Sequence, residues 1–407
     1  MRFCKVSFPL CAAFLLLLNA MAAAQTLTTL HSFNNQDGAY PIAPLILDSE
    51  GNLYGSAGAG GLTVNYPFGS GVLFEITPSG SEIVIHYFGS SPTDGIAPNA
   101  VIRDASGNFY GTTEVGGTGV GAGTIFGISA AGTETVLYNF QQGPSGSEPE
   151  SGLVQDRQGN LYGTTVQGGY SMGECTVGGC GLVFKVAPSG AVSVLYNFTG
   201  PPDADYPDWP LAIDAQGNLY GTSAFGGAFG YGAVYKITPT GTETVIYNFP
   251  GPPGAAYPIG GLLLGANGAL YGATASGGPY TGLSCTVQGC GTVYELTPSR
   301  MTILYSFEGG SDGAGPSGGL VRDGDGNFYG ATGLGGVSDS QGGQGVIYEL
   351  TPAGVESVLY RFTGGKDGAY PLSPLTLDQS GNIYGVTFWG GVRSGDTGFG
   401  TAFKLIP

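Results

Sequence analysis

One short string, Gly-Asn-X-Tyr-Gly with an apolar X, recurs along almost the whole chain and limits what it can fold into. Its tyrosines are Tyr54, Tyr110, Tyr162, Tyr220, Tyr271, Tyr329 and Tyr384, and the copy at Tyr271 has decayed to Gly-Ala-Leu-Tyr-Gly. The first and last tyrosines are 330 residues apart, so the six intervals average 55 residues. Seven such repeats account for residues 25–407 and leave no room for a second domain.

Each repeat contains four short apolar segments separated by turns, and the third repeat shows them well. Residues 153–155 and 161–165 flank a D-x-x-G-N turn at 156–160, and residues 182–186 and 191–198 flank a Pro-Ser-Gly turn. Apolar and polar residues alternate with period two in the last segment, as in a strand with one buried face. Asp accepts hydrogen bonds from nearby backbone N–H groups, and Gly and Asn tolerate positive φ, so we predict antiparallel hairpins.

Four antiparallel strands in each of seven repeats predict an all-β fold, a seven-bladed β-propeller of four-stranded blades. A β-helix is the competing architecture. Residues 27–33 align with the fourth strand of the repeat and residues 401–405 with the third, so the strand missing at the end of the chain is present at its beginning. A ring pairs the two segments and leaves no sheet edge there, whereas an open solenoid gains nothing from the split. We therefore expect the N-terminal strand to close the last blade.

A family resemblance is clearest in the last repeat. The residues that carry it are Phe362, the run D-G-A-Y-P from Asp367, Asp378, the run G-N-I-Y-G from Gly381 and the pair Gly390-Gly391. With these motifs the chain resembles the GloVer tandem-repeat family of exported bacterial proteins over residues 27–407. The resemblance implies an exported protein of β-propeller-like repeats, and it supplies no activity and no site residues.

Residues 1–24 have the pattern of a signal peptide. Arg2 and Lys5 precede a mostly apolar stretch, and Ala22-Ala23-Ala24 offers a cleavage site. The alternative, a membrane anchor, needs about 20 apolar residues, and this run is shorter and contains Pro9. We expect residues 25–407 to remain as a single secreted or periplasmic (extracellular) domain.

Four cysteines follow the signal peptide, as the pairs Cys175/Cys180 and Cys285/Cys290. Both pairs lie in the same loop of the repeat, between the second and third strands. A zinc site is the alternative, but one repeat separates the two pairs and the usual C-x2-C spacing is absent. We predict two local disulfides, which suit an oxidising compartment.

Charge and composition exclude several functions. The chain has 12 Lys+Arg against 29 Asp+Glu, a net charge of -17 that repels nucleic acid and anionic lipid. We expect a monomer that does not insert into membranes after signal cleavage. The only histidines, His31 and His86, occupy a position that holds Tyr in the other repeats, so we interpret them as structural substitutes and not as general bases. No cofactor is predicted. Calcium in the turn at 323–327 is the alternative, although the spacing of a calcium loop is incomplete there.

The candidate binding residues are those that break the repeat symmetry on one face. That face carries the D-G-A-Y-P segments and the long Gly-rich loops. Its aromatic residues, which would stack on sugar rings or anchor polypeptide, are Tyr40, Tyr206, Trp209, Tyr257, Tyr370 and Trp389. The alternative is that these rings pack between blades.

Two acidic residues also break the repeat symmetry, at a position where other repeats have no charged side chain. Glu150 and Asp208 follow the D-G-A-Y-P-type proline of the third and fourth repeats, where four other repeats have Ile42, Ile259, Ser317 and Leu372. We predict that they form an acidic pair at the mouth of the channel, which coordinates a cation or shares one proton. The alternative is two solvated acids.

These features favour an exported, non-catalytic recognition propeller that binds a glycan or a protein on one loop face. One alternative is a carboxylate-based carbohydrate-active enzyme, namely a hydrolase, lyase or lactonase. The other is a structural cell-surface protein. No catalytic residue is predicted. Clustered carboxylates in an open cavity would favour the enzyme, and a plugged channel with an aromatic rim would favour binding.

Overall fold

The computed structural model describes residues 25–62, 67–169, 175, 178–282, 284–336, 343–391 and 398–407, so the predicted signal peptide (1–24) lies outside the described residues. Within these ranges the regular structure is β, apart from the two short 3-10 turns η1 (Gly143–Ser145) and η2 (Ala266–Gly268). The all-β prediction is confirmed. No helix in the described ranges is long and apolar enough to span a membrane.

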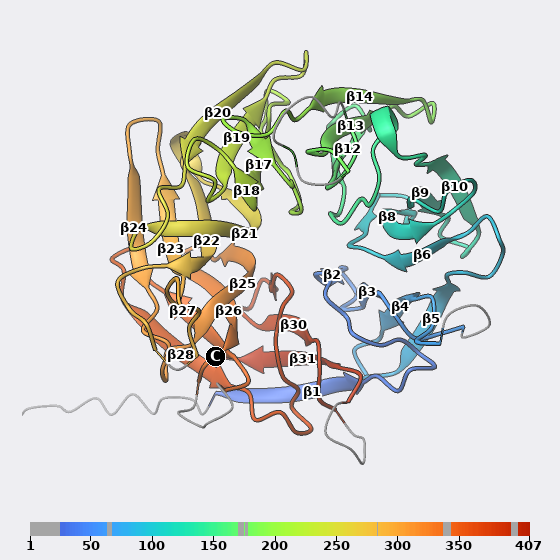
Figure 1. Cartoon of the computed structure of the whole chain (residues 1–407). Helices are drawn as coiled ribbons and strands as arrows, with labels where there is room; N and C mark the ends of the chain where they lie inside the picture. Colours follow the sequence, from blue (N-terminus) through green and yellow to red (C-terminus); the bar gives the residue numbers. More distant parts are fainter. Residues whose placement is uncertain are drawn as a thin grey trace, which may run out of the picture.

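The strands pair mainly antiparallel, and most repeats contribute at least four strands that pair with their neighbours in chain order (Figure 1). The first three repeats give β2 (Ile46–Leu47), β3 (Leu53–Ala57), β4 (Val72–Ile76) and β5 (Glu82–Tyr87); β6 (Gly95–Pro98), β7 (Ile102–Arg103), β8 (Phe109–Gly116), β9 (Thr124–Ile128) and β10 (Glu134–Asn139); and β11 (Val154–Gln155), β12 (Leu161–Thr165), β13 (Leu182–Val186) and β14 (Val192–Asn197).

The next three repeats follow the same order. They give β16 (Ala212–Ile213), β17 (Leu219–Ser223), β19 (Ala233–Ile237) and β20 (Glu243–Asn248), with the ribbon β15 (Ala204–Asp205) and β18 (Phe225–Gly226); β21 (Ala255–Leu264), β22 (Leu270–Gly277), β23 (Thr292–Leu296) and β24 (Met301–Ser306); and β25 (Ala314–Arg322), β26 (Phe328–Leu334), β27 (Val346–Leu350) and β28 (Glu356–Arg361). One parallel bridge between Gly261 and Gly319 joins the last two of these sheets.

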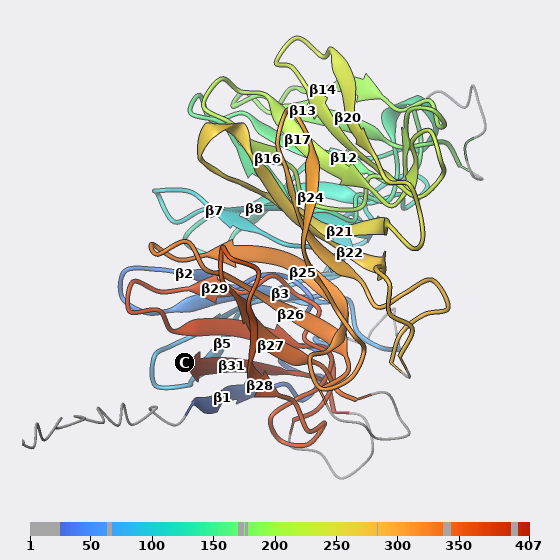
Figure 2. The same ribbon diagram turned by 90° about the vertical axis from the view of Figure 1, so that its left-hand side faces the viewer.

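The last sheet contains strands from both ends of the chain. Its order is β29 (Thr376–Leu377), β30 (Ile383–Thr387), β31 (Thr401–Ile406) and β1 (Thr26–Ser32). β1 runs antiparallel to β31, with Thr26 opposite Ile406 and Ser32 opposite Thr401. Figure 2 shows β1 lying against β31, and Figure 1 shows the sheets side by side around a central space. The pairing expected between residues 27–33 and 401–405 is therefore present.

A single carboxylate closes the hairpin between the two inner strands of a sheet. In the third sheet, Asp156 Oδ1 accepts the N–H groups of Gln158 and Asn160, each at 2.9 Å. Its Oδ2 accepts from Asn160 Nδ2 at 2.7 Å and from the Tyr162 hydroxyl at 3.0 Å. Burial raises the pKa of Asp156, but these bonds outweigh it and hold the pKa below its ordinary value. The interpretation of this aspartate as a turn cap agrees with these contacts.

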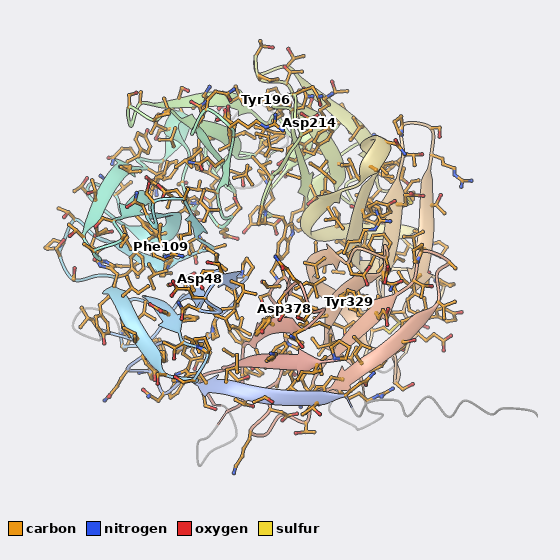
Figure 3. All side chains as sticks on the ribbon, turned by 180° about the vertical axis from the view of Figure 1, so that it is seen from behind. Asp48, Phe109, Tyr196, Asp214, Tyr329 and Asp378 are labelled. Carbon is orange, nitrogen blue, oxygen red and sulfur yellow. A yellow bond between two sulfur atoms is a disulfide. The ribbon has the colours of Figure 1, made fainter. Side chains whose placement is uncertain are left out.

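Five other repeats use the same turn. Their aspartates, which accept the same four hydrogen bonds, are Asp48, Asp104, Asp214, Asp323 and Asp378. Figure 3 labels Asp48, Asp214 and Asp378, each in a different sheet. The motif repeats because each turn satisfies its own backbone locally.

Neighbouring sheets approach each other closely at a glycine, and each repeat has such a glycine just before its third strand. These glycines, with φ between +84° and +98°, are Gly71, Gly123, Gly181, Gly232, Gly291, Gly345 and Gly400. The carbonyl of Gly181 accepts the N–H of Phe198 at 3.1 Å. A Cβ atom at Gly181 would collide with the carbonyl oxygen of Thr165 and lie 2.8 Å from Cδ of Pro207 in the next repeat. Glycine is required because both the positive φ and the close approach exclude a side chain.

The last and first repeats make this contact as well. Phe33 donates its N–H to the carbonyl of Gly400 at 3.0 Å, and a Cβ atom at Gly400 would lie 2.8 Å from Cδ of Pro41. The Phe33 ring is 4% exposed and packs edge-on against Phe74, with 5.0 Å between ring centroids. The core thus lies between sheets, where rings of neighbouring repeats interlock.

Candidate functional site

A small cavity, here named the axial pocket, lies where the inner segments of six repeats converge. Its volume is about 200 Å³. Ile42 and Pro44 come from the segment before β2, and Leu372 comes from the segment before β29. Most of the lining is apolar, and the charged or indole groups in it are Glu150, Asp208 and Trp209.

The axial pocket brings together the two acidic residues that break the repeat symmetry. Glu150 precedes β11 and Asp208 precedes β16, and both line the cavity. The Tyr206 hydroxyl donates to Glu150 Oε1 at 3.3 Å. Asp208 Oδ1 and Trp209 Nε1 are shielded from solvent, and neither has a hydrogen-bond partner among the described residues. Other described residues also have buried polar atoms without a partner, but here two such atoms belong to adjacent residues that line one cavity, which makes this pocket the candidate site.

Both carboxyl groups hold their protons more tightly than usual. Burial raises the pKa of Asp208 to about 8, a hydrogen bond from its own backbone opposes the rise, and the charge of Glu150 adds to it. Burial raises the pKa of Glu150 to about 7, the charge of Glu114 adds to the rise, and the Tyr206 hydroxyl opposes it. Burial, and not repulsion within the acidic pair, is therefore the main cause.

Replacement of Asp208 by Asn should stabilise the protein in a pH-dependent way. The folded pKa of about 8 lies above the ordinary value of 3.8, so the Asp208 carboxyl favours folding at low pH, and this contribution is lost as the pH rises through 8. The difference in Tm between Asp208→Asn and the parent should be small at pH 4, widen by several degrees by pH 8 and then level off. A Tm difference that stays constant from pH 4 to pH 9 would contradict the buried, protonated carboxyl.

Side chains of the neighbouring sheet fix the backbone around Glu150. Asn99 Nδ2 donates to the carbonyl of Pro149, and Thr112 Oγ1 donates to the carbonyl of Ser151 at 2.8 Å. Asn99 Nδ2 also donates to Thr112 Oγ1 at 3.2 Å, so that the two side chains act together. The carboxylate of Glu150 is thus held at the cavity by a buried polar network and not by a loose loop.

The predicted rim tyrosines share an unusual backbone conformation. Tyr40, Tyr206, Tyr257 and Tyr370 have φ between +56° and +63°, where residues other than glycine are uncommon. Each donates its N–H to a carbonyl of a neighbouring repeat, as Tyr257 does to Tyr231 at 2.9 Å. All four side chains are only half exposed. The backbone at these positions therefore connects repeats.

The rim rings pack against one another outside the axial pocket. Tyr40 stacks on Phe388 with 5.0 Å between centroids, and Tyr370 meets Trp389 edge-on at 4.9 Å. Tyr206 and Tyr257 both contact Phe225, at 6.0 and 5.9 Å. Of the six predicted aromatic residues, only Trp209 lines the pocket, and Tyr206 reaches it through Glu150. The other four lie in contacts between rings, as the alternative interpretation expects.

Sequence analysis missed two acidic residues beside this site, Glu114 and Glu148. Their charges act on Glu150, and burial raises the pKa of Glu148 as well. Glu148 takes the place of the rim tyrosine in the third repeat, with φ of 55°. Glu150 was identified by comparing one position across the repeats, and the same comparison at the tyrosine position would have identified Glu148.

The cysteines lie as predicted, in loops between second and third strands. Cys175 and Cys180 are bonded with Cα atoms 5.0 Å apart, and Cys285 and Cys290 with Cα atoms 4.5 Å apart. Each pair is local, with a sequence separation of 5 residues. Neither pair lines the axial pocket.

Comparison with protein families agrees with the repeat pattern. The model of the Gloeobacter/Verrucomicrobia repeat matches residues 17–177, 63–285 and 281–407. The chain belongs to this family. A search of curated proteins found no match.

Solved structures resemble this member of the Gloeobacter/Verrucomicrobia repeat family at low identity. Virginiamycin B lyase from Staphylococcus aureus has a TM-score of 0.61 at 14% identity, over 94% of this chain and 99% of the lyase chain. The extracellular domain of a protein named as a hybrid two-component system, from B. thetaiotaomicron, has a TM-score of 0.55 at 14% identity. That match covers 95% of this chain and 41% of the other. These likenesses show a β-propeller-like fold.

Proposed function

We propose that the chain is an exported, closed seven-bladed propeller that binds a carbohydrate in the axial pocket and does not transform it. The observation that carries the proposal is that two residues lining this mostly apolar pocket, Asp208 and Trp209, each have a buried polar atom without a partner, Asp208 Oδ1 and Trp209 Nε1. A buried polar group without a partner costs about 1–3 kcal/mol. A ligand that supplies both partners recovers that free energy.

The chemistry of the pocket favours a neutral ligand with hydroxyl groups. Because the pKa values of Glu150 and Asp208 are about 7 and 8, Glu150 is about half ionised and Asp208 is mostly protonated at neutral pH, so the pocket carries less than one full negative charge. A hydroxyl group both donates and accepts, so it can pair with a carboxyl group and with the Trp209 N–H. The volume of about 200 Å³ lies below the roughly 300–1,000 Å³ of sites for drug-sized molecules, and it suits one sugar ring at the end of a glycan.

Three observations support the closed, exported form. The Gly400 contacts with Phe33 and Pro41 repeat the contacts between other neighbouring sheets. The paired cysteines suit an oxidising compartment. The likeness to an extracellular domain agrees with a location outside the cytoplasm. We propose that the protein acts there as a monomer.

A glycan array with residues 25–407, followed by calorimetry on the best ligand, tests the proposal. Trp209→Phe keeps a ring but removes the N–H donor and should weaken binding about 3- to 10-fold, the effect of one neutral hydrogen bond. Trp389→Phe is the matched control, because Trp389 lies outside the pocket, and it should leave the affinity unchanged. Absence of any retained glycan, or equal effects of the two variants, would contradict the proposal and favour a protein ligand.

A carboxylate-based hydrolase or lyase is the second candidate. It is favoured by the raised pKa of Glu150, because a carboxyl group that is protonated near neutral pH can act as a general acid. If the protein releases new sugar ends from the bound glycan and Glu150→Gln abolishes this release, the function is catalysis and not recognition. Binding without release keeps the first proposal.

A further inference from the structure

Both histidines of the chain lie beside one Asp and one Glu where neighbouring sheets meet. His86 is on β5, the outer strand of the first sheet, and Glu134 is on β10, the outer strand of the next. Asp94 lies in the segment between the two sheets. One ligand atom from each of these three residues lies within 4.8 Å of the other two. We name these residues the His86 cluster.

The other junctions show what is unusual about the His86 cluster. Tyr196 occupies the same register, since it lies opposite Val183 as His86 lies opposite Leu73. Its hydroxyl donates to Asp203 at 3.0 Å. The histidine makes no such bond.

The distances in the His86 cluster are too long for hydrogen bonds. His86 Nε2 lies 3.7 Å from Asp94 Oδ2 and 3.7 Å from Glu134 Oε2. Within the described residues, His86 Nε2, Asp94 Oδ1 and Glu134 Oε1 are buried and have no hydrogen-bond partner. Asp94 is only 3% exposed. The imidazole therefore faces two buried carboxyl groups without a hydrogen bond to either, and those two groups interact with each other.

Such separations match those between ligands of one metal ion. Zinc lies about 2.0–2.2 Å from imidazole nitrogen and carboxylate oxygen, so two ligands at the corners of a tetrahedron are about 3.4 Å apart. The two separations of 3.7 Å are close to this edge. Small side-chain movements would bring all three atoms into contact with one ion.

We propose that His86, Asp94 and Glu134 bind a divalent transition-metal ion of the Zn²⁺ class, which joins β5 to β10 across the junction. The imidazole selects zinc and similar ions over Ca²⁺ and Mg²⁺, which prefer oxygen ligands. Ser90 donates its N–H and its hydroxyl to Asp94 Oδ2, at 2.9 and 3.0 Å, and so orients the carboxylate as a second shell does in metal sites. The site is structural and independent of the axial pocket.

A similar set one junction earlier provides an internal comparison. His31 Nε2 is 3.2 Å from Asp37 Oδ2, within hydrogen-bond distance, and Asn34 Nδ2 donates to the same oxygen at 2.6 Å. His31 is thus already paired with Asp37, whereas His86 Nε2 has no hydrogen-bond partner among the described residues. We assign the ion to the His86 cluster and not to this one.

Zinc binding by residues 25–407 tests the assignment. After treatment with a chelator and dialysis, one equivalent of Zn²⁺ should bind, and Tm should rise by about 3 °C when the free ion is about 100 times Kd. Equal concentrations of Ca²⁺ and Mg²⁺ should not raise Tm. His86→Tyr installs the side chain that five other repeats carry, so it should fold normally and lose both the bound ion and the shift.

His31→Tyr is the matched control and should keep one equivalent of zinc and the full shift. Co²⁺ in place of Zn²⁺ provides a direct signature, a visible absorption band that should be present in the parent and absent in His86→Tyr. The assignment is overturned if the parent binds no zinc, if His86→Tyr still binds it, or if His31→Tyr removes it. Because the readouts are metal content and Tm, failure of the glycan experiment does not affect them.

Discussion

A variant that lacks residues 27–33 is expected to lose cooperative folding. The deletion removes the strand paired with β31 and the buried ring of Phe33, and it uncovers the edge of the last sheet. Loss of a large buried aromatic side chain alone costs about 3–5 kcal/mol, and the whole stability of a domain is about 5–15 kcal/mol. Circular dichroism melting and size-exclusion chromatography should show no transition at the parental Tm and a shift to aggregates. An unchanged melting transition would contradict closure of the ring by β1.

A circular permutant separates the loss of the strand from the loss of its position. The permutant starts at Asn34 and carries residues 26–33 after Pro407, joined by an added Ser-Gly. The junction reproduces the Pro188-Ser189-Gly190 turn between β13 and β14, so the moved strand can pair with β31 in the order used by other repeats. It should melt within a few degrees of the parent. If it also aggregates, the effect of the deletion does not come from the missing strand.

Gly400→Ala is expected to lower the free energy of unfolding by about 3 kcal/mol or more. Gly400 has a φ of +98°, and a Cβ atom there would collide with the carbonyl oxygen of Thr387 and press on Pro41 of the first repeat. Backbone strain and overpacking each cost about 1–3 kcal/mol. Chemical denaturation of the parent and the variant would measure the loss.

Gly381→Ala is the matched control in the same sheet. Gly381 has a φ of +79°, but a Cβ atom there would have no neighbour within 4 Å. Only the strain of the positive φ remains, so the free energy of unfolding should fall by about 1 kcal/mol. If the two variants lose the same stability, the close packing between the last and first repeats contributes nothing.

The sequence predicts the hairpins well because their determinants are local. Asp156 forms all of its bonds within six residues, and the same interval recurs along the chain. The predicted third strand at 182–186 is β13. The predicted first strand at 153–155 is shorter, since β11 covers only Val154–Gln155. The preceding Ser151 carbonyl bonds to a side chain of another sheet, and no pattern within one repeat can show such a contact.

The candidate site was predicted in part. Glu150 and Asp208 stand out because they break a repeated apolar position, and they do line one pocket. Burial, and not the charge of either residue on the other, is the main cause of their raised pKa values. Burial depends on how six inner segments meet, which spacing along the chain does not reveal. For the same reason the sequence left open whether Tyr40 and Tyr370 are exposed or packed, and both are half-buried.

The pairing of β1 with β31 also sets the order of assembly. Every other strand finds its partners within its own repeat or the next one, but Thr26 must wait for Ile406. A ribosome makes β1 first and β31 last, so β1 remains unpaired while the intervening repeats are made and fold in turn. Polar side chains separate the two leucines of β1, whose sequence is Thr-Leu-Thr-Thr-Leu-His-Ser. This composition suits a strand that stays exposed to solvent until β31 has been made. The pairing of β1 with β31 therefore spans most of the chain, and it can form only after β31 has been made.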